Sequence, residues 1–394
     1  MSDKQARSIH DLRTVVVGTG FIGPVHVEAL RRIGVNVVGL IGSTPQKSKV
    51  AARRLGVAGD LTTLDEALAD PDVDCIHLAT PNHLHYPQVK QVLAAGKHVM
   101  CEKPLAMNTV QSSELVRLAD ASDLKAGVAY NIRFYPLCHE AAARIAAGDA
   151  GPIHHITGSY VQDWLLHRSD FNWRVTSEQG GELRAVADIG THWLDMVQFI
   201  TKQKVIEVMA DLQTVHSTRD RPLGSVQTFT NETSRDFDSS FESVNIDTED
   251  AGSVLLRFDG GARGVVHVSQ TTAGRKNSIS FEIAGSRQTL AFHSEQPNTL
   301  WAGFRDQPNQ MLIRDPSLMS GDASAIANYP GGHAEGFPDT FKQLFKCFYQ
   351  HIASGSQKPE RSYPTFEDGH REIMICEAIL KSHRQQTWVS IDHE

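Results

Sequence analysis

Three polar residues have the types and spacings that suit proton transfer to or from a hydroxyl group. Lys103 lies between a glutamate and a proline, in a Glu-Lys-Pro sequence that directly follows the expected strand 98–101. Asp188 and His192 are four residues apart, a spacing that puts both side chains on one face of a helix that begins early enough. A histidine with its ordinary pKa of about 6.5 can remove such a proton close to neutral pH. A lysine ammonium can stabilise the negative charge that develops on the oxygen.

Loss of that proton is one half of the oxidation of a secondary alcohol, and departure of a hydride from the carbon is the other. For this chemistry we expect His192 to be the base, Lys103 to hold the oxygen and Asp188 to orient one of them. Lys103 as the base is the rival hypothesis, because burial near another cationic group can lower the pKa of a lysine. Either assignment needs an acceptor for the hydride.

A glycine-rich turn near the N-terminus predicts that acceptor. Residues 15–17 are valines, the sequence Gly-x-Gly-x-x-Gly follows at 18–23, and a helix-like apolar pattern begins at Val25. A strand, a tight turn and a helix in this order bind the pyrophosphate of a dinucleotide. The first glycine permits the turn, the second lets the backbone approach the phosphates, and the third lets the helix pack on the strand, while the N–H groups of the helix start bind the anion. The turn residues expected at the cofactor are Gly18, Gly20, Phe21, Ile22 and Gly23.

The residues after the second expected strand favour NADP over NAD. NAD-binding units usually carry an acidic residue about 20 positions after the glycines, where it binds the ribose hydroxyl. Here those positions are Gly42, Ser43 and Thr44, followed by Lys47. The two hydroxyls could donate to a 2′-phosphate, and the ammonium could neutralise it. The alternative is structural: Ser43 and Thr44 could cap the next helix, with Lys47 in solvent.

Five short motifs occur in a fixed order along the chain. They are the glycine turn at 18–23, TPNHLH at 80–85, EKPL at 102–105, DIGTH at 188–192 and TFEDG at 365–369. Together they closely resemble the Gfo/Idh/MocA family, whose members include glucose–fructose oxidoreductase and inositol dehydrogenase, and the resemblance covers nearly the whole chain. Two further stretches, at 162–175 and 299–306, resemble a branch of this family that acts on sugars and anhydrosugars such as levoglucosan.

The resemblance implies a fold and a set of roles. The implied fold is an α/β Rossmann domain with a doubly wound parallel sheet, followed by an α+β domain with a large, open, mostly antiparallel sheet. Lys103 would touch both the nicotinamide and the substrate hydroxyl, and Asp188 and His192 would complete the active site. The residues expected to line the nicotinamide end are Thr80, Asn82, His85 and Glu102. The implied activity is that of an NAD(P)-dependent dehydrogenase for a sugar, an anhydrosugar or a cyclitol.

Several further residues are candidates for substrate contacts, each with a structural alternative. Trp164, Trp173 and Arg174 could stack against the face of a sugar ring, although isolated tryptophans are more often core residues. The resemblance suggests a substrate contact for Arg133, which could equally form an ion pair at the domain junction. His333 follows two glycines and could reach the pocket or be structural.

The histidine pairs do not predict a metal site. His83 and His85 would share a face on a strand, but no third ligand is indicated, and a zinc site needs one. His154 and His155 would point to opposite faces of a strand. We therefore expect no bound metal.

Strands and helices alternate through the first third of the chain, which predicts a parallel sheet in a first domain at residues 1–130. The expected strands there are 35–41, 74–80, 98–101 and 126–130, and the expected helices are 46–55, 87–95 and 109–121, with a capping box at 63–66. Strand-like runs at 205–212, 251–258, 264–270, 278–284 and 289–293 predict an antiparallel sheet in a second domain at residues 131–394. Further helices are expected at 137–147, 192–200, 335–352 and 366–386, a polar surface excursion at 217–247, and irregular chain at 298–330. By resemblance, the helix at 366–386 returns to the first domain.

The composition is that of an ordinary globular protein, with 40% hydrophobic and 21% charged residues. The net charge of −8 argues against a nucleic-acid partner, which would need a concentrated basic surface. No apolar run approaches the length of a membrane span, and the polar N-terminus lacks the apolar core of a signal peptide. The five cysteines have no C-x-x-C spacing, which favours a reducing, cytoplasmic compartment. The resemblance implies a homodimer or a homotetramer.

Two other functions would use the same cofactor fold. A glycosidase that oxidises its substrate transiently with bound NAD would cleave a glycoside without a net change in the cofactor. A regulator would bind the cofactor without catalysis, which the presence of Lys103, Asp188 and His192 disfavours. Net formation of NADH or NADPH separates a dehydrogenase from both.

Overall fold

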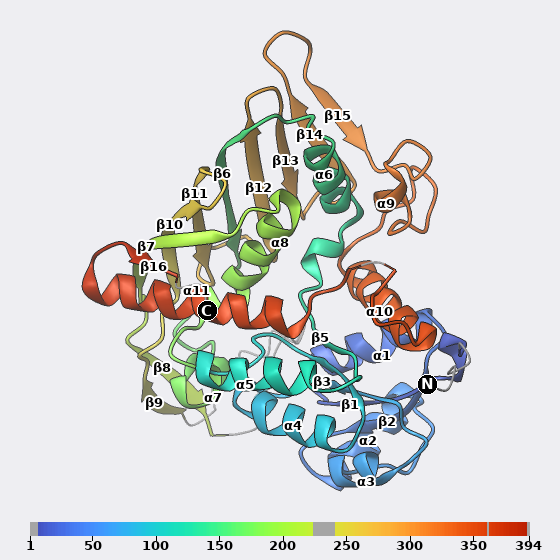
Figure 1. Ribbon diagram of the computed structural model, residues 1–394. Helices are drawn as coiled ribbons and strands as arrows, with labels where there is room; N and C mark the ends of the chain where they lie inside the picture. The colour runs from blue at the N-terminus through green and yellow to red at the C-terminus, as the bar shows by residue number, and fades with distance from the viewer. Residues whose placement is uncertain (1–6, 224–240, 361, 392–394) are drawn as a thin grey trace. The chain divides into compact units, whose positions relative to one another are not determined.

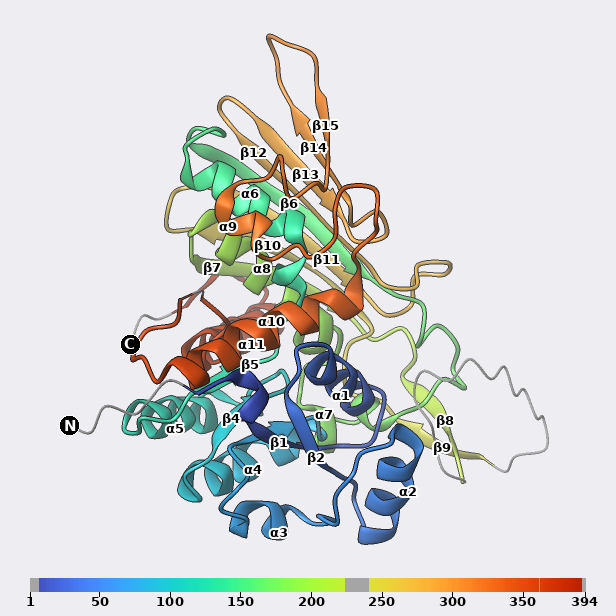
Figure 2. The same ribbon diagram turned by 90° about the vertical axis from the view of Figure 1, so that its right-hand side faces the viewer.

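The computed structural model describes residues 7–223, 241–360 and 362–391 (Figures 1 and 2). The chain divides into two compact units. Unit 1 contains the chain up to Asn131 together with Phe341–Ile373. Unit 2 contains most of the chain from Ile132 to Thr340 together with the chain from Met374 onward. Each unit has its own sheet and its own hydrophobic core.

Unit 1 is built on a five-stranded parallel sheet, which confirms the prediction from alternating strands and helices. The strands are β1 (Arg13–Val17), β2 (Asn36–Ile41), β3 (Cys75–Leu78), β4 (His98–Cys101) and β5 (Ala126–Val128). Their order is β2-β1-β3-β4-β5, so the strand order reverses between β1 and β3. Sheets of this kind bind ligands at the reversal, beyond the carboxyl ends of the strands.

The helices of unit 1 begin and end close to the expected positions, with two exceptions. They are α1 (Ile22–Arg32), α2 (Pro45–Leu55), α3 (Leu64–Ala69), α4 (Asn82–Ala94), α5 (Thr109–Asp120) and most of α10 (Phe337–Ser354), with a short 3-10 helix η1 (Ile9–Asp11) before β1. The capping box of α3 forms as predicted between Thr63 and Glu66. Helix α1 begins at Ile22 rather than near Val25, and α4 begins at Asn82, so that Pro87 lies inside it. The first turns of both helices are polar or rich in glycine, so the apolar periodicity does not reveal where they start.

The core of unit 1 combines sheet and helix residues. Val15, Ile76 and Val99 come from neighbouring strands and Leu115 from α5, all of them fully buried. Phe366 joins them as the first residue of α11 (Phe366–Gln385). The first turns of α11 therefore belong to unit 1, whereas its later turns belong to unit 2.

Unit 2 is built on a nine-stranded sheet in which neighbouring strands are antiparallel except for β6 and β11. In sheet order the strands are β15 (Gln310–Ile313), β14 (Thr299–Gly303), β13 (Thr289–His293), β12 (Ser278–Gly285), β6 (Ile153–Val161), β11 (Arg263–Ser269), β10 (Ala251–Phe258), β7 (Val205–Gln213) and β16 (Val389–Ser390). This confirms the predicted mostly antiparallel sheet. The parallel pair β6 and β11 ends at the same edge of the sheet, because parallel strands run in the same direction.

Two segments expected to be irregular contain strands. The stretch 298–330 includes β14 and β15, which extend the large sheet at one edge. The stretch 217–247 includes β8 (Thr218–Pro222) and β9 (Phe241–Asn245), which pair in a separate two-stranded sheet, and residues 224–240 lie outside the described part. Both predictions were wrong because these strands are short and their apolar residues do not alternate with polar ones; Met311 and Ile313 of β15, for example, are both exposed.

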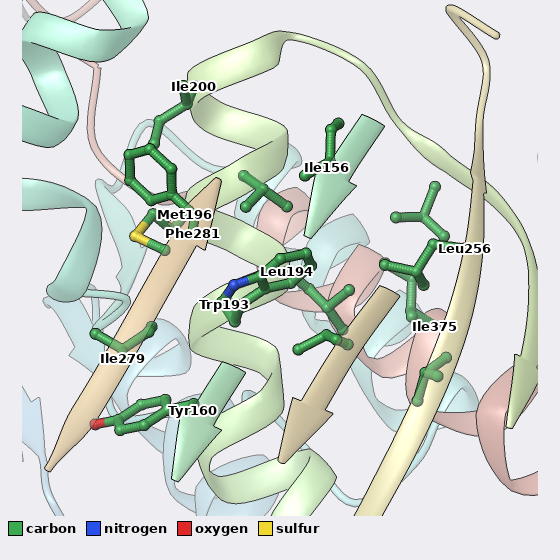
Figure 3. Close-up of a cluster of buried hydrophobic side chains, with 14 of the residues drawn as sticks. Ile156, Tyr160, Trp193, Leu194, Met196, Ile200, Leu256, Ile279, Phe281 and Ile375 are labelled. Atoms are coloured by element: carbon green, nitrogen blue, oxygen red, sulfur yellow. The ribbon is translucent and has the colours of Figure 1, made fainter. Parts of the chain in front are cut away.

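Helices α6 (Pro136–Ala146) and α8 (Thr191–Thr201) cover one face of the large sheet (Figures 1 and 2). Figure 3 shows how α8 packs: Trp193, Leu194, Met196 and Ile200 point among side chains of the sheet. Trp193 is fully buried, and its indole N–H donates to the carbonyl oxygen of Ser280 at 2.8 Å. The anchored tryptophan fixes the rotation of α8. The remaining short elements are η2 (Ile132–Phe134), η3 (Trp173–Val175), α7 (Ser177–Gly180), η4 (Val186–Gly190) and α9 (Gly321–Ser324).

Candidate active site

The glycine turn after β1 has the shape that a dinucleotide site requires. Gly18 has a φ of +126°, and a Cβ atom there would lie 2.2 Å from the carbonyl oxygen of Ala79. A Cβ atom at Gly23 would lie 1.9 Å from the carbonyl oxygen of Gly18, so the fold itself requires these two glycines. A Cβ atom at Gly20 would meet no atom within 4 Å. The turn therefore leaves room for a ligand at the one glycine that the fold does not need.

Helix α1 presents its N-terminus at this turn. Ile22 is its first residue, and Phe21 occupies the N-cap position. A phenyl ring cannot accept hydrogen bonds from the first N–H groups of the helix, and the Phe21 side chain makes none. These N–H groups and the positive end of the helix dipole suit a pyrophosphate. The residues present thus fit the phosphates of a dinucleotide.

The three polar residues after β2 bond to one another. The Thr44 hydroxyl accepts a hydrogen bond from Lys47 N at 3.2 Å and caps α2, as the structural alternative predicted. The Lys47 ammonium donates to the Ser43 hydroxyl at 3.1 Å. A cation and two hydroxyl groups therefore stand together at the end of β2, where the adenosine ribose of a dinucleotide lies in this fold.

His85 joins the loop after β3 to the loop after β4. Its imidazole is fully buried, with Nε2 at 2.8 Å from the carbonyl oxygen of Thr80 and Nδ1 at 2.7 Å from the carbonyl oxygen of Pro104. Burial lowers the pKa of His85. Each ring nitrogen faces a backbone oxygen, and a neutral imidazole donates to one of them, so His85 contacts both loops and helps to hold them in place. The Thr80 hydroxyl donates to Gln88 Oε1 at 2.7 Å, and Asn82 is the nearly buried first residue of α4.

The predicted lysine follows a buried carboxylate. Glu102 is 7% exposed, and its Oε2 accepts from the backbone N–H of Lys103 at 3.2 Å. Its other oxygen, Oε1, lies 3.0 Å from His26 Nε2. The Lys103–Pro104 peptide bond is cis. Glu102 therefore fixes the backbone from which the Lys103 side chain extends.

In unit 2, Asp188 lies in η4, a π-helical turn that leads directly into α8. Gln270 Nε2 donates to Asp188 Oδ2 at 2.9 Å, and Arg174 Nε lies 3.5 Å from Asp188 Oδ1. A second carboxylate caps the start of this π-helical turn. Glu249 accepts hydrogen bonds from the backbone N–H groups of Arg184 and Val186. Burial raises the pKa of Glu249 to about 7.

His192 lies on α8 beside a chain of hydrogen bonds. It is 7% exposed, and its ring centroid is 6.3 Å from that of Tyr160. The Tyr160 hydroxyl and Gln162 Nε2 both donate to Asn277 Oδ1 at 2.7 Å. The indole N–H of Trp164 donates to Gln162 Oε1 at 2.6 Å. Polar groups therefore run from the neighbourhood of His192 to Trp164.

The predicted aromatic and cationic residues come together with Asp188. The Arg174 guanidinium lies 4.3 Å from the ring centroid of Trp173 and 5.8 Å from that of Trp164. The same guanidinium faces Asp188, and both side chains of that pair are partly exposed, at 18% and 17%. We name Trp164, Trp173, Arg174 and Asp188 the Asp188 cluster. It offers aromatic faces and charged groups to a ligand.

Arg133 and His333 make other contacts within unit 2. Arg133 is 7% exposed, its Nε is 3.6 Å from Asp195 Oδ2, and its guanidinium lies over the Phe199 ring. These contacts favour the structural ion pair over a substrate contact. His333 is exposed, its Nδ1 lies 3.4 Å from the carbonyl oxygen of Gly331, and its own carbonyl accepts from Arg314. These contacts join His333 to Gly331 and Arg314, within the same segment of unit 2.

The supporting residues Gln162, Gln270, Asn277 and Glu249 were missed by sequence reasoning. They stand outside every motif, and only the sheet brings them to Asp188 and Tyr160. One signal was available for two of them. Gln162 directly follows β6 and Gln270 directly follows β11, the parallel pair whose carboxyl ends share one edge of the sheet.

In the described residues, no group of three or more histidines, cysteines, aspartates or glutamates is arranged to hold a metal ion. His85 of the His83–His85 pair is occupied by backbone oxygens, as described above. No helix within the described ranges is long and apolar enough to cross a membrane.

Comparisons with known proteins agree with this geometry. Residues 12–130 match a model described as an oxidoreductase family with an NAD-binding Rossmann fold, GFO_IDH_MocA, and residues 138–291 match the C-terminal domain model of the same family. The chain is 28% identical to levoglucosan dehydrogenase of Pseudarthrobacter phenanthrenivorans, over 97% of this chain and 99% of that protein.

Solved structures extend the likeness to three dimensions. A levoglucosan dehydrogenase in complex with NADH and levoglucosan has a TM-score of 0.84 and 26% identity, and the match covers 97% of this chain and 99% of the other. An inositol dehydrogenase homologue from Azotobacter vinelandii with NAD+ has a TM-score of 0.83 at 23% identity, over 99% of this chain and all of the other, which supports the fold alone.

Proposed function

Because the chain belongs to the Gfo/Idh/MocA family of NAD(P)-dependent oxidoreductases, we propose that it transfers hydride between the nicotinamide and a secondary hydroxyl or carbonyl of a sugar, an anhydrosugar or a cyclitol. The observation that carries the proposal is the Asp188 cluster. A carbohydrate ring has apolar faces and polar edges, so aromatic rings pack against it while charged groups bond to its hydroxyls. The likeness to levoglucosan dehydrogenase over nearly the full length supports a compact cyclic substrate.

The chemistry divides among the cofactor and three residues of the chain. The nicotinamide, when bound, supplies the carbon that accepts or returns the hydride. His192 removes the hydroxyl proton, since an imidazole suits transfer near neutral pH. Lys103 holds the substrate oxygen and stabilises its developing negative charge. Asp188 orients these groups and is itself fixed by Gln270 and Arg174.

The remaining predicted residues support cofactor binding. The α1 N-terminus and Gly20 suit the pyrophosphate, and the loops after β3 and β4 suit the nicotinamide end. At the adenosine end, the Lys47 ammonium held by Ser43 supports NADP over NAD, because no carboxylate follows β2 to repel a 2′-phosphate. The preference is measured as the ratio of kcat/KM for the two cofactors, and an equal or better value with NAD would contradict it.

The decisive experiment is a spectrophotometric screen of sugars, anhydrosugars and cyclitols with NAD and NADP in parallel. We expect net formation of reduced cofactor with at least one cyclic polyol. Glycoside cleavage without net reduction would favour the glycosidase mechanism, and cofactor binding without any turnover would favour a regulator. With an active substrate in hand, Lys103→Met and His192→Ala are expected to lower kcat by orders of magnitude while cofactor binding survives. Near-normal turnover of either variant would refute the role of that residue.

We further propose that the protein forms a homodimer or homotetramer in a reducing, cytoplasmic compartment. The large sheet leaves apolar residues such as Leu255 of β10 exposed, opposite to buried neighbours on the helix-covered face. All five cysteines are buried and reduced, which suits such a compartment. Light scattering of the purified protein measures the oligomeric state, and a monomer at micromolar concentration would contradict this part of the proposal.

A further inference from the structure

Four buried side chains of unit 1 form a continuous hydrogen-bonded chain that ends at the Lys103 loop. The Tyr349 hydroxyl lies 3.0 Å from His77 Nε2, His77 Nδ1 lies 3.0 Å from His26 Nδ1, and His26 Nε2 lies 3.0 Å from Glu102 Oε1. Both imidazoles and the tyrosine are fully buried, and Glu102 is 7% exposed. The other oxygen of Glu102 accepts from the backbone N–H of Lys103. None of these contacts is required by the proposed chemistry, so their presence needs a separate explanation.

The chemistry of the acceptor sets the direction of this chain. A carboxylate can only accept, so the hydrogen between His26 and Glu102 belongs to His26 Nε2. With neutral imidazoles, His26 Nδ1 then accepts from His77 Nδ1–H, and His77 Nε2 accepts from the Tyr349 hydroxyl. Burial and the neighbouring His26 hold the pKa of His77 well below its ordinary value, which agrees with a neutral His77. Every donor in this series of hydrogen bonds, from Tyr349 to Glu102, then has an acceptor.

The four residues come from four separate elements of unit 1. His26 lies on α1, one turn after the glycine turn, and Glu102 directly follows β4. His77 lies on β3, and Tyr349 lies on α10, which packs against α1 through Phe341 and Phe345. The Phe345 ring centroid is 4.7 Å from the ring centroids of both His26 and His77. This apolar surrounding excludes water and strengthens the hydrogen bonds.

We propose that His26 is a positioning residue that braces the Lys103 loop against the phosphate-binding helix α1, and that His77 and Tyr349 hold His26 in the orientation this requires. This proposal rests on the proposed function, because the proposed function is what assigns Lys103 a catalytic role. The helix that binds the pyrophosphate and the loop that carries the catalytic lysine are then joined by one buried contact. A shift of about 1 Å in a reacting group can lower a rate about 100-fold, so the brace acts on kcat.

Two amide substitutions at His26 separate the two bonds of its ring. In His26→Gln the amide nitrogen reaches the position of Nε2, so it can still donate to Glu102 but cannot accept from His77. In His26→Asn the amide oxygen matches Nδ1, so it can accept from His77 but cannot reach Glu102. We expect His26→Asn to lower kcat at least about 10-fold with little change in the cofactor Kd, and His26→Gln to stay within about 3-fold of the wild type. Equal kcat values for the two variants would overturn the proposal, because a merely structural histidine would tolerate both alike.

A pair of tyrosines supplies a matched control for the far end of the chain. Tyr349 and Tyr363 are both buried in unit 1, each bonds a histidine through its hydroxyl, and each packs edge-on against Phe348. Tyr363 bonds His351, whose other nitrogen faces the carbonyl oxygen of Ser356 and not a residue of the Glu102 series. We expect Tyr349→Phe to lower kcat about 3-fold or more and Tyr363→Phe to leave kcat unchanged at a similar cost in thermal stability. Equal kcat values for these two variants would remove Tyr349 from the proposal.

A readout without turnover tests the bond itself. In the wild-type protein labelled with 15N-histidine, the nitrogen shifts of His26, assigned by comparison with His26→Gln, should show a hydrogen on Nε2. A bare Nε2 would refute the proposed direction of the chain. Lys103→Met measured beside these variants separates the two levels of inference. If Lys103→Met abolishes turnover and His26→Asn does not lower kcat, only the brace is refuted, whereas a fully active Lys103→Met refutes the catalytic role on which the brace depends.

Discussion

Two aspartates of unit 2, Asp250 and Asp188, both contact arginine but in opposite surroundings. Asp250 lies between Arg184 and Arg219 with no exposed surface, and it also accepts from the backbone N–H groups of Val215 and His216. Asp188 faces Arg174 at 3.5 Å, and both side chains are partly exposed. We call the first contact closed, because its side chains are fully buried, and the second open, because it is longer and its side chains are partly exposed. An aspartate–arginine pair therefore says little about its role until the exposure of both side chains and their other hydrogen-bond partners are known.

The largest effect should come from the open contact. Asp188→Asn keeps the shape of the side chain and its bond to Gln270 but removes the charge. We expect kcat to fall about 100- to 10,000-fold, since the charge that we propose to orient the groups of proton transfer is lost. The melting temperature and the cofactor Kd should stay close to those of the wild type. If Asp188→Asn lost as much stability as Asp250→Ala, the distinction between an open and a closed contact would be contradicted.

The closed contact should respond in stability instead. Asp250→Ala leaves two arginines buried without their carboxylate, and breaking a buried pair in this way costs about 3–5 kcal/mol. The measurement is urea unfolding followed by circular dichroism. Asp220→Ala is the matched control, because Asp220 pairs with Arg168 at the surface, where such pairs contribute about 0–1 kcal/mol. Similar midpoints for the two variants would show that Asp250 is less important than its burial indicates.

A smaller effect is expected at the aromatic wall of the open contact. Trp173→Ala removes the ring on which Arg174 stacks, and with it the apolar face that we propose for the substrate. We expect the KM for the carbohydrate to rise about 10-fold, from a loss of about 1–2 kcal/mol in binding, with the cofactor KM unchanged. Trp388→Ala is the control, since Trp388 stacks on Arg257 at another place in unit 2. A larger change in the KM for the cofactor than in the KM for the carbohydrate would contradict the proposed contact between Trp173 and the substrate.

The smallest effect concerns Glu249, the neighbour of Asp250 that caps the turn carrying Asp188. Burial raises its pKa to about 7 in the folded protein, so the folded state binds this proton more tightly than the unfolded state does. Its contribution to stability is therefore complete below its ordinary pKa and is lost as the pH rises through about 7. Glu249→Gln keeps an acceptor for the backbone N–H groups and cannot ionise. We expect the melting temperature to fall less between pH 5.5 and pH 8 in this variant than in the wild type, and an equal fall would exclude Glu249 as its source.

Local signals in the sequence predicted the elements that carry motifs. Gly18 and Gly23 have the tight contacts that the turn demands, and Thr63 caps its helix as its spacing to Glu66 indicated. The position of Lys103 after β4 follows from the alternation of strands and helices. In each case the signal lies in residues within a few positions of one another, so the pattern is visible without knowledge of the fold, although the contact that requires Gly18 comes from Ala79.

The parts that depend on distant residues could not be read in this way. Gln270 reaches Asp188 because β11 and the helix containing Asp188 belong to the same unit, although 82 positions separate the two residues. The π-helical turn at Asp188 depends on Glu249, which accepts from its first N–H groups. His26 and His77 gave no motif at all, because each is an isolated histidine whose partner is supplied by tertiary packing. Functional sites that depend on such long-range contacts can be recognised only when the fold is known.

The contact between His77 and Tyr349 also bears on how the chain is completed during synthesis. These residues are 272 positions apart, and nearly all of unit 2 lies between them. A ribosome therefore releases the whole parallel sheet long before α10 emerges to cover His26 and His77. Unit 2 likewise receives β16 and the later turns of α11 only from the last part of the chain. Both units must wait for the same C-terminal segment, so the polypeptide acquires its two finished cores almost together rather than one after the other.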